Sequence, residues 1–482
     1  MTNTTNVTTT IIAPSRRDML AGAVGIAGAS ALGAATFALG EAIAQPAGLP
    51  VRRDIATFAP DDPQIAKFAA AVQEMMDRSS RDPNDPKGWL VNANAHASFC
   101  SVPGPADPDQ IHYCYWFLSW HRAYITVTER KIREIAGDPS IAYPYWNWST
   151  DRRIPQAFAQ SGSALSNAIR FTPDRPVQDG EVDYFPDDPT LGQLGVAALA
   201  VRTFVAKTPS QIGRSFGGIA RPNPAGRYGN NRLEGTPHGP IHNYVGGVDD
   251  QGNGGDMSDF ETAGRDPIFF AHHGNLDRLW EIWRQDPARK ATEPSTDDFV
   301  SHPFVFTWLD GTNIEVAAGD TLDTTKLGFV YDNLQVFRPN APAVIAAQAV
   351  QNRLPPVATG KLRVPLSPQG VGAGERKILE ITDVEKPDQL MTVGVYVKPS
   401  DAPASEPGTS VGTFAAVKAG KQIAWPSQTL TFDITAAAQK YAGQELTVEL
   451  IPFRLRAQSA GPPVNYPPLK YGEMRIVTEQ PQ

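Results

Sequence analysis

The sequence predicts a mainly α-helical domain with much irregular structure, followed by a small all-β domain. Apolar residues recur at helical spacing in three segments, Ile65–Ser80, Phe117–Ile135 and Phe269–Arg284. From Lys361 onward this period gives way to short alternating runs separated by Gly, Pro and Ser, a pattern typical of strands. Glycine and proline are both abundant, with 41 and 43 residues. Because regular elements exclude them from their interiors, much of the chain is expected to be loops and turns.

The N-terminal segment, residues 1–44, is predicted to be a twin-arginine-type signal peptide rather than part of the fold. Arg16 and Arg17 precede a weakly hydrophobic run, Leu20–Leu39, and a small-x-small cleavage site follows at Ala42–Ala44. An ordinary secretory signal and an uncleaved anchor remain as alternatives. The preferred interpretation predicts export by the twin-arginine translocase, which carries folded proteins, to the periplasm or beyond the cell.

Residues 45–337 are expected to form the helical domain. Its first helix is followed by a loop rich in Pro and Gly, Asp82–Gln110. After the helix Phe117–Ile135 comes a mostly irregular stretch, Thr150–Arg232. A further helix begins near Thr236, ahead of the helix Phe269–Arg284.

The composition changes after residue 337. Residues 338–360 are rich in Pro and Ala and are expected to be a linker. Residues 361–482 are expected to form the all-β domain. Its predicted strands are Lys377–Thr382, Met391–Val397, Thr413–Val417, Gln428–Ile434 and Glu445–Phe453.

The charge and the cysteine content exclude some classes of protein. The net charge is −8, and no basic stretch is long enough to indicate nucleic-acid binding. Two cysteines in 482 residues exclude a disulfide-rich scaffold. A small-molecule partner is expected, with no membrane contact beyond export, and the oligomeric state stays open.

Histidine is rare in this chain, and its distribution is uneven. Of eight histidines, six fall into two groups of three. The first group is His96, His112 and His121, and the second is His238, His242 and His273. Neutral imidazole is the commonest protein ligand for copper and zinc. Two groups of three predict two metal ions, each with room left for an exogenous ligand.

The second group requires a choice between two adjacent histidines. His238 and His242 are four residues apart, so they share one face of a helix. His272 and His273 point about 100° apart on a helix, so one of them is expected to bind the metal. His273 is preferred because Asp277 lies one turn further on the same face and can orient its ring or its surroundings. His272 is then a buried neighbour of the site, with the reversed assignment left open.

Two motifs resemble the copper signatures of tyrosinases and catechol oxidases. They are His112-x4-Phe117-Leu118-Ser119-Trp120-His121-Arg122-x2-Ile125-x3-Glu129 and Asp266-Pro267-x-Phe269-x3-His273-x3-Asp277. The resemblance spans roughly residues 65–331. It implies a type 3 dicopper protein in which a four-helix bundle holds two copper ions, with O2 as co-substrate. The implied reaction is the oxidation of o-diphenols to o-quinones, with weaker o-hydroxylation of monophenols.

Finer features resemble the plant-type polyphenol oxidase branch of this family. The segment Leu233–His238 is similar to the one whose Glu holds a water that deprotonates phenols, which implies that role for Glu234. The segment beginning at Met257 implies that Phe260 is the gatekeeper above the first copper. Gly239 stands where several efficient monophenol hydroxylases have Asn, so diphenol oxidation is expected to exceed monophenol hydroxylation.

Cys100 lies four residues after His96, where plant-type enzymes form a thioether. The resemblance therefore implies a Cys100–His112 crosslink, while a Cys100–Cys114 disulfide is the alternative. The β domain is expected to shield the copper site and keep the enzyme latent.

Three other functions compete with phenol oxidation as interpretations of the same histidine groups. An o-aminophenol oxidase and a haemocyanin-like O2-binding protein remain open, because both use the same dicopper centre. A dinuclear zinc hydrolase is disfavoured, because such sites generally include bridging carboxylates and neither histidine group has one.

Overall fold

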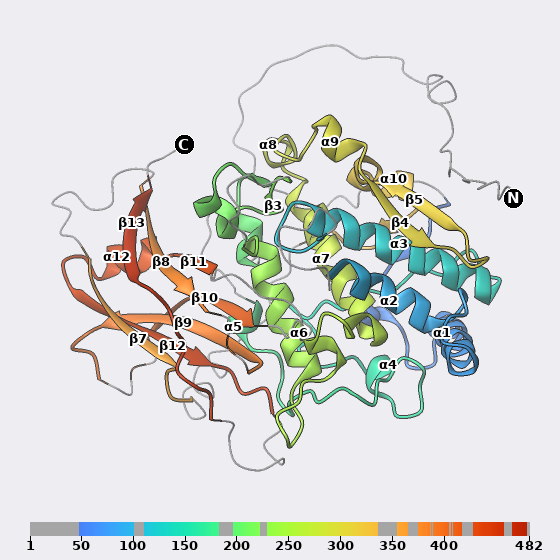
Figure 1. Cartoon of the computed structure of the whole chain (residues 1–482), viewed down its shortest axis with the longest axis horizontal. Helices are drawn as coiled ribbons and strands as arrows, with labels where there is room; N and C mark the ends of the chain where they lie inside the picture. The colour runs from blue at the N-terminus through green and yellow to red at the C-terminus, as the bar shows by residue number, and fades with distance from the viewer. Residues whose placement is uncertain are drawn as a thin grey trace, which may run out of the picture.

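The computed structural model describes a helical part and a β-rich part (Figure 1). The described residues are 48–100, 110–182, 196–221, 229–335, 354–364, 375–385, 387, 389–403, 406, 408–416, 428–456 and 465–479. The predicted fold class, mainly α with a separate β-rich part, is confirmed. The predicted signal peptide and most of the predicted linker lie outside the described residues.

Three of the long helices were predicted within two residues at each end. They are α1 (Pro63–Arg81), α3 (Trp116–Ala136) and α7 (Ile268–Trp283). The Asp62 side chain caps α1 by accepting from the backbone N–H of Gln64. α3 ends at Gly137, whose φ of 62° lies in the left-handed region that favours glycine. α3 and α7 are buried along most of their length, which places them at the centre of the helical part (Figure 1).

The prediction of a continuous loop over Asp82–Gln110 is wrong for the middle of that segment. Residues Trp89–Cys100 form a helix, α2, between two stretches rich in Pro and Gly. Its buried side chains lie at helical spacing and are Trp89, Asn92, Ala93 and His96. Two of these four are polar, so the buried stripe does not show as an apolar pattern in the sequence.

The remaining elements of the helical part are short. The longest of them is α6 (Gly239–Gly246), which a single π-helical turn, Glu234–His238, precedes. The stretch predicted to be irregular, where it is described, contains only brief elements. The other short elements are β1 (Val51–Arg52), α4 (Gln156–Ala159), α5 (Asp179–Val182), β2 (Val205–Ala206), β3 (Gly218–Ile219), α8 (Pro287–Lys290), α9 (Asp297–Val300), β4 (Pro303–Thr307), β5 (Asn313–Ala317), α10 (Thr324–Leu327) and β6 (Val330–Tyr331).

A buried ion-pair network joins both ends of the helical part to α3 and α7. Arg52 in β1 donates to Glu129 of α3 at 2.9 Å and to Asp277 of α7 at 3.3 Å. Arg122 of α3 also pairs with Asp277, and the Tyr331 hydroxyl in β6 donates to the same carboxylate at 2.5 Å. Because each charge has a partner, the network fixes the relative positions of the two helices without leaving a buried charge uncompensated.

The β-rich part consists of two sheets around its own apolar core. One sheet has the order β10-β9-β12-β7 and the other β11-β8-β13. Strands β8 to β12 match the five predicted strands. The bounds are β7 (Ala358–Arg363), β8 (Arg376–Val384), β9 (Met391–Pro399), β10 (Thr409–Ala416), β11 (Gln428–Asp433), β12 (Glu445–Pro452) and β13 (Met474–Glu479).

Three details of the β domain differ from the prediction. β7 begins at Ala358, inside the predicted linker, because it pairs with β12 at the edge of the four-stranded sheet. β13 was not predicted. The domain also contains one short helix, α12 (Thr435–Lys440), so it is not purely β.

Among the described helices, none combines the length and the apolar character needed to cross a membrane.

Candidate metal centre

The six predicted ligands converge from four helices, one π-helical turn and one loop. His96 lies on α2, His121 on α3, His242 on α6 and His273 on α7. His238 ends the π turn ahead of α6, and His112 precedes α3. All six side chains are at most 3% exposed. The four-helix arrangement that the family resemblance implied is therefore present.

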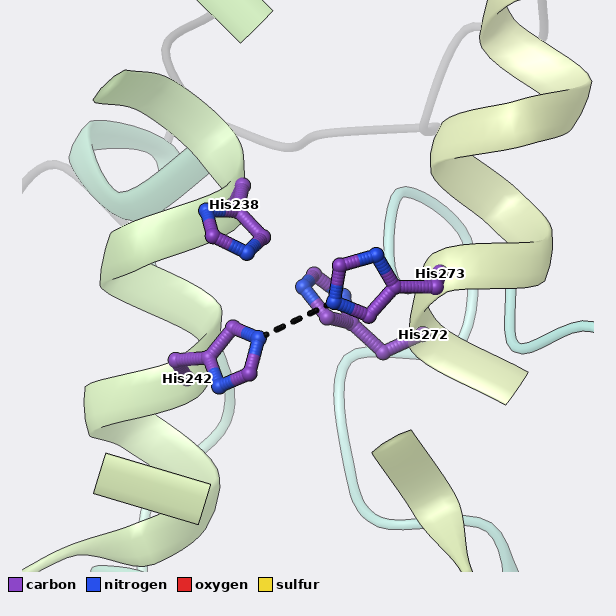
Figure 2. A group of neighbouring side chains, drawn as sticks. All are labelled: His238, His242, His272 and His273. Atoms are coloured by element: carbon purple, nitrogen blue, oxygen red, sulfur yellow. Dashed lines mark hydrogen bonds between the residues drawn. The ribbon is translucent and has the colours of Figure 1, made fainter. Parts of the chain in front are cut away.

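The histidines form two groups that face each other. The possible ligand atoms of His96, His112 and His121 lie within 4.8 Å of one another. The same holds for a second group, His238, His242, His272 and His273 (Figure 2). The rings of His121 and His273 stack across the two groups, with centroids 4.1 Å apart and an interplanar angle of 4°.

Backbone carbonyls fix the orientation of four of the rings. Each carbonyl lies next to a ring Nδ1 and can only accept a hydrogen bond, so Nδ1 carries the proton and Nε2 keeps its lone pair. A hydrogen bond at the remote nitrogen is the usual support for a histidine that binds metal. The pairs are His96 with Phe260 (2.9 Å), His121 with Phe117 (2.7 Å), His238 with Glu234 (3.1 Å) and His242 with Met257 (2.6 Å).

With the proton on Nδ1, the Nε2 atoms of these rings are buried hydrogen-bond acceptors, and they need a cation or a donor. Nε2 of His121 and of His238 has no hydrogen-bond partner, although both atoms are buried. Nε2 of His242 lies 3.2 Å from Nε2 of His273, as the dashed line in Figure 2 shows. A buried nitrogen lone pair without a donor is costly, and a metal ion removes that cost. The donor set therefore fits two metal ions held by imidazole alone.

Burial keeps these imidazoles neutral. It lowers the pKa of His96 to about 3 and that of His242 to about 4. The pKa values of His112, His121, His238 and His273 are also lowered well below the usual range, first by burial and then by the neighbouring rings. Neutral imidazole is the form that binds copper and zinc.

The hydrogen bonds of His272 and His273 differ, and the difference favours His273 as the metal ligand. The indole N–H of Trp148 donates to Nδ1 of His272 at 3.2 Å, so that nitrogen holds a lone pair already in use. Asp277, which was expected to orient the His273 ring or its surroundings, does the latter. Its carboxylate binds Arg122, Arg52 and Tyr331, so it holds α7 against α3 rather than supporting a ring.

Glu234 links residues next to the two histidine groups: it lies in the turn that ends at His238, and its carboxylate reaches the backbone beside His112. Its carboxylate accepts from the backbone N–H of Tyr113, next to His112, at 2.9 Å and from the Asn231 amide at 3.1 Å. Burial raises the pKa of Glu234 to about 8, while these N–H donors pull it back toward its usual value.

Phe260 and Gly239 also lie at the centre. The Phe260 ring stacks on His112, with centroids 4.7 Å apart and an interplanar angle of 28°. Phe260 thus contacts a predicted ligand of the first metal, while its gatekeeper role stays a prediction. Gly239 is buried and begins α6, directly after His238. The position of Gly239 directly after His238 agrees with the sequence. Its effect on the preference between diphenols and monophenols stays a prediction.

The structure describes the side chain of only one of the two cysteines. Cys100 ends α2, but its side chain lies outside the described part of the structure. Cys114 is a free, buried thiol that donates to the Gln110 carbonyl at 3.4 Å, and burial raises its pKa. The disulfide alternative is therefore not formed, and the predicted thioether remains a proposal.

The β domain is seated on the helix that carries His242. The Thr236 hydroxyl donates to the Thr413 carbonyl of β10 at 2.6 Å. The Asn243 amide donates to the Met391 carbonyl at 3.1 Å, and the Thr392 hydroxyl and the Ala416 carbonyl lie within 3.3 Å of it. Figure 1 shows β10 beside α5 and α6. The β domain thus contacts residues next to His238 and His242 in the sequence.

Comparisons with known proteins agree with this geometry. A family model described as the common central domain of tyrosinase matches residues 86–286. Chloroplastic polyphenol oxidase E of Solanum lycopersicum is 32% identical over 284 residues, which cover 57% of this chain and 47% of that protein. Over this region the chain is similar to the tyrosinase and polyphenol oxidase family.

Other similar proteins agree with this comparison. Chloroplastic catechol oxidase B of Solanum tuberosum is 31% identical, again over 57% of this chain and 47% of that protein. The chain thus spans about half the length of these polyphenol oxidases. Latent apple tyrosinase shares the fold with a TM-score of 0.61 and 23% identity, covering 90% of this chain and 98% of that chain. That coverage includes both the helical and the β-rich part.

Sequence reasoning missed three residues that support the centre. Trp148 lies just before the stretch predicted to be irregular, and Asn231 lies at the end of that stretch, three residues before Glu234. Asn243 follows His242 directly, so its position next to a predicted ligand was the available signal. Their partners lie far away in sequence, with the exception of the Asn231–Glu234 pair, and only the fold reveals them.

Proposed function

We propose that this protein oxidises o-diphenols to o-quinones with O2 at two copper ions, and hydroxylates monophenols more weakly. The observation that carries the proposal is the pair of facing histidine groups, with Nδ1 atoms held by carbonyls and Nε2 atoms left as buried acceptors. The names of the relatives support the substrate class, because two of them are a polyphenol oxidase and a catechol oxidase.

Each copper ion would have its own imidazole set. His96, His112 and His121 would hold one, and His238, His242 and His273 the other. When bound, the two ions supply the redox chemistry that passes electrons from the diphenol to O2. The chain's own groups orient the imidazoles, exclude water by burial and narrow the approach to the first site with the Phe260 ring.

Proton transfer distinguishes the two kinds of substrate. A monophenol must lose its hydroxyl proton before its ring is attacked, and the Glu234 carboxylate, acting through a held water, is the base proposed for this step. Gly239 offers no amide to help hold that water, in contrast to an Asn at this position. Diphenol oxidation is therefore the main proposed activity.

Two further proposals concern maturation. A thioether between Cys100 and His112 would fix the His112 ring. Intact mass after reduction and thiol alkylation tests it, since two alkylated thiols would exclude the crosslink. Export by the twin-arginine translocase is tested by replacing Arg16 and Arg17 with lysine and following the protein in the periplasm, where unchanged export would exclude that route.

The β domain is proposed to keep the full-length enzyme latent. Its contacts with Thr236 and Asn243 seat it on the second copper helix and support this role. A shield of this kind would also be compatible with an O2-binding protein, which blocks substrate access by design.

A substrate panel on copper-loaded protein, intact and clipped between the domains, tests the proposed function. Catechol is expected to give quinone colour and O2 uptake, with tyrosine turned over more slowly and after a lag. A Gly239→Asn variant is expected to raise the tyrosine share. Faster turnover of an o-aminophenol than of catechol would favour that alternative, and reversible O2 binding with no turnover of any substrate would favour an O2 carrier.

A further inference from the structure

The second histidine group contains four histidines, one more than the three ligands proposed for its metal ion. Three imidazoles leave an open position on the metal, but four possible ligands lie within 4.8 Å of one another (Figure 2). All four are buried, so water does not compete for their nitrogens. A site that must bind an exogenous ligand therefore needs something that keeps the fourth imidazole away from the metal.

His272 differs from its neighbours in the chemistry at Nδ1. His238 and His242 face carbonyl oxygens, which accept, whereas His272 faces the indole N–H of Trp148, which only donates. Nδ1 of His272 must therefore carry the lone pair, and the proton of the ring sits on Nε2. Neither nitrogen then has a lone pair to offer a metal, because one is engaged by the indole and the other is protonated.

The indole that imposes this state is itself held in place. Trp148 is fully buried, and its backbone N–H donates to the Trp146 carbonyl at 3.0 Å. The backbone N–H of Trp146 donates in turn to the carbonyl of Ala271, the residue before His272, at 2.9 Å. The segment that carries the donor is thus pinned to the helix that carries the acceptor.

We propose that Trp148 is a positioning residue that holds His272 in the tautomer unable to bind metal, so that the second site keeps three imidazoles and an open position. The proposal rests on the proposed copper assignment and concerns how that site is kept reactive. The reverse tautomer would place two N–H groups face to face in a buried pocket, which the native contact avoids.

Removing the indole donor is expected to close the open position. In Trp148→Phe both tautomers of His272 become accessible, and its free lone pair can complete the coordination of the second ion. The matched control is Trp146→Phe, which also removes a buried indole, but one whose N–H donates to the Asp151 carbonyl at 2.9 Å. A double variant, Trp148→Phe with His272→Phe, removes the fourth imidazole as well.

Azide titration of the Co²⁺-loaded protein, followed by the visible bands of the metal, measures the open positions directly. Cobalt in the first histidine group serves as the internal reference. Azide binding at one of the two ions is expected to weaken at least tenfold in Trp148→Phe, to stay unchanged in Trp146→Phe and to recover in the double variant. Unchanged binding in Trp148→Phe, equal weakening in Trp146→Phe, or no recovery of binding or of cobalt loading in the double variant would overturn the proposal.

This experiment involves neither phenol nor O2. A protein that loads two cobalt ions and shows the azide pattern but does not oxidise phenols would refute the proposed function alone. A protein whose second group loads no metal would refute the copper assignment itself.

Discussion

Glu234 contacts the flanks of both histidine groups. Its backbone carbonyl holds the ring of His238, and its carboxylate holds the backbone N–H of Tyr113, the neighbour of His112. A change in its charge is therefore felt on both sides of the centre at once. Because burial raises its pKa to about 8, this charge changes close to neutral pH in the metal-free protein.

Monophenol hydroxylation is expected to depend on the ionised form of Glu234. A carboxyl whose pKa is raised stays neutral below that value, so the base form grows as the pH rises. The rate should therefore rise with a midpoint at or below about 8, since bound copper ions favour the anion. In Glu234→Gln hydroxylation is expected to fall about 100-fold or more and to lose this rise, because a general base contributes about that much.

Diphenol oxidation in the same variant is the control for this prediction. It should change far less than hydroxylation, since a diphenol needs no ring attack after proton loss. Equal losses in both activities across the pH range would show that Glu234 supports the structure of the site instead.

At the level of residues, rarity and spacing predicted the two groups of histidines that the fold brings together. Six of eight histidines fall into two groups, and four-residue and adjacent spacings restrict which rings can meet. The tautomer proposed for His272 could not be predicted from the sequence, because the hydrogen-bond donor to its ring, Trp148, lies 124 positions away. Hydrogen bonds between distant residues decide such chemistry, and a single sequence does not display them.

α6 is the element on which both parts of the protein meet. It carries His242 toward the metal centre, and the next residue, Asn243, reaches β9 and β10. Successive helix positions point about 100° apart, so adjacent residues serve different neighbours. Movement of the β domain is therefore expected to shift His242, a proposed metal ligand, in addition to any change in access.

Asn243→Ala is expected to raise the activity of the intact protein toward that of the clipped one. The change removes the amide that donates to the β domain and leaves the Met391 carbonyl without this donor, which costs about 1–3 kcal/mol of domain docking. The readout is the ratio of intact to clipped activity, because any direct effect on the neighbouring His242 cancels in that ratio. Asn253→Ala, at an exposed loop amide, should leave the ratio unchanged, and the same ratio in both variants would contradict this role of Asn243.

At the level of elements, periodicity found the helices whose buried stripe is apolar. It failed for α2, where Asn92 and His96 occupy buried positions because they serve the centre and its surroundings. Asn92 binds the Thr128 hydroxyl on α3, so its polarity is satisfied internally. Polar residues placed for function thus removed the signal by which the helix would have been recognised.

The two-part organisation was predictable from the change in period, but the way the parts dock was not. The docking includes contacts such as Thr236 with Thr413 and Arg175 with the Arg454 carbonyl. These contacts join residues that are 177 and 279 positions apart. Nothing in the local sequence around them distinguishes an interface from an ordinary surface.

Cleavage between the two parts is expected to activate the protein. A protease site introduced within residues 338–353 would separate the chain there, and release of the β domain should raise catechol oxidation about tenfold or more if the domain shields the site. Size-exclusion chromatography after cleavage reports whether the domain has left. Equal activity before and after its departure would show that it serves stability only.

The buried network around Arg52 has a consequence for biosynthesis. Arg52 and Tyr331 lie 279 positions apart, yet both bind Asp277, and β1 pairs with β6 beside them. At about 5–20 residues per second, the ribosome needs roughly 15–55 seconds between these two residues. During that time β1 has no partner strand, and Asp277 of α7 lacks the Tyr331 hydroxyl that binds it. Copper is therefore best loaded after synthesis of the helical domain is complete, when the two ends of that domain have closed on each other.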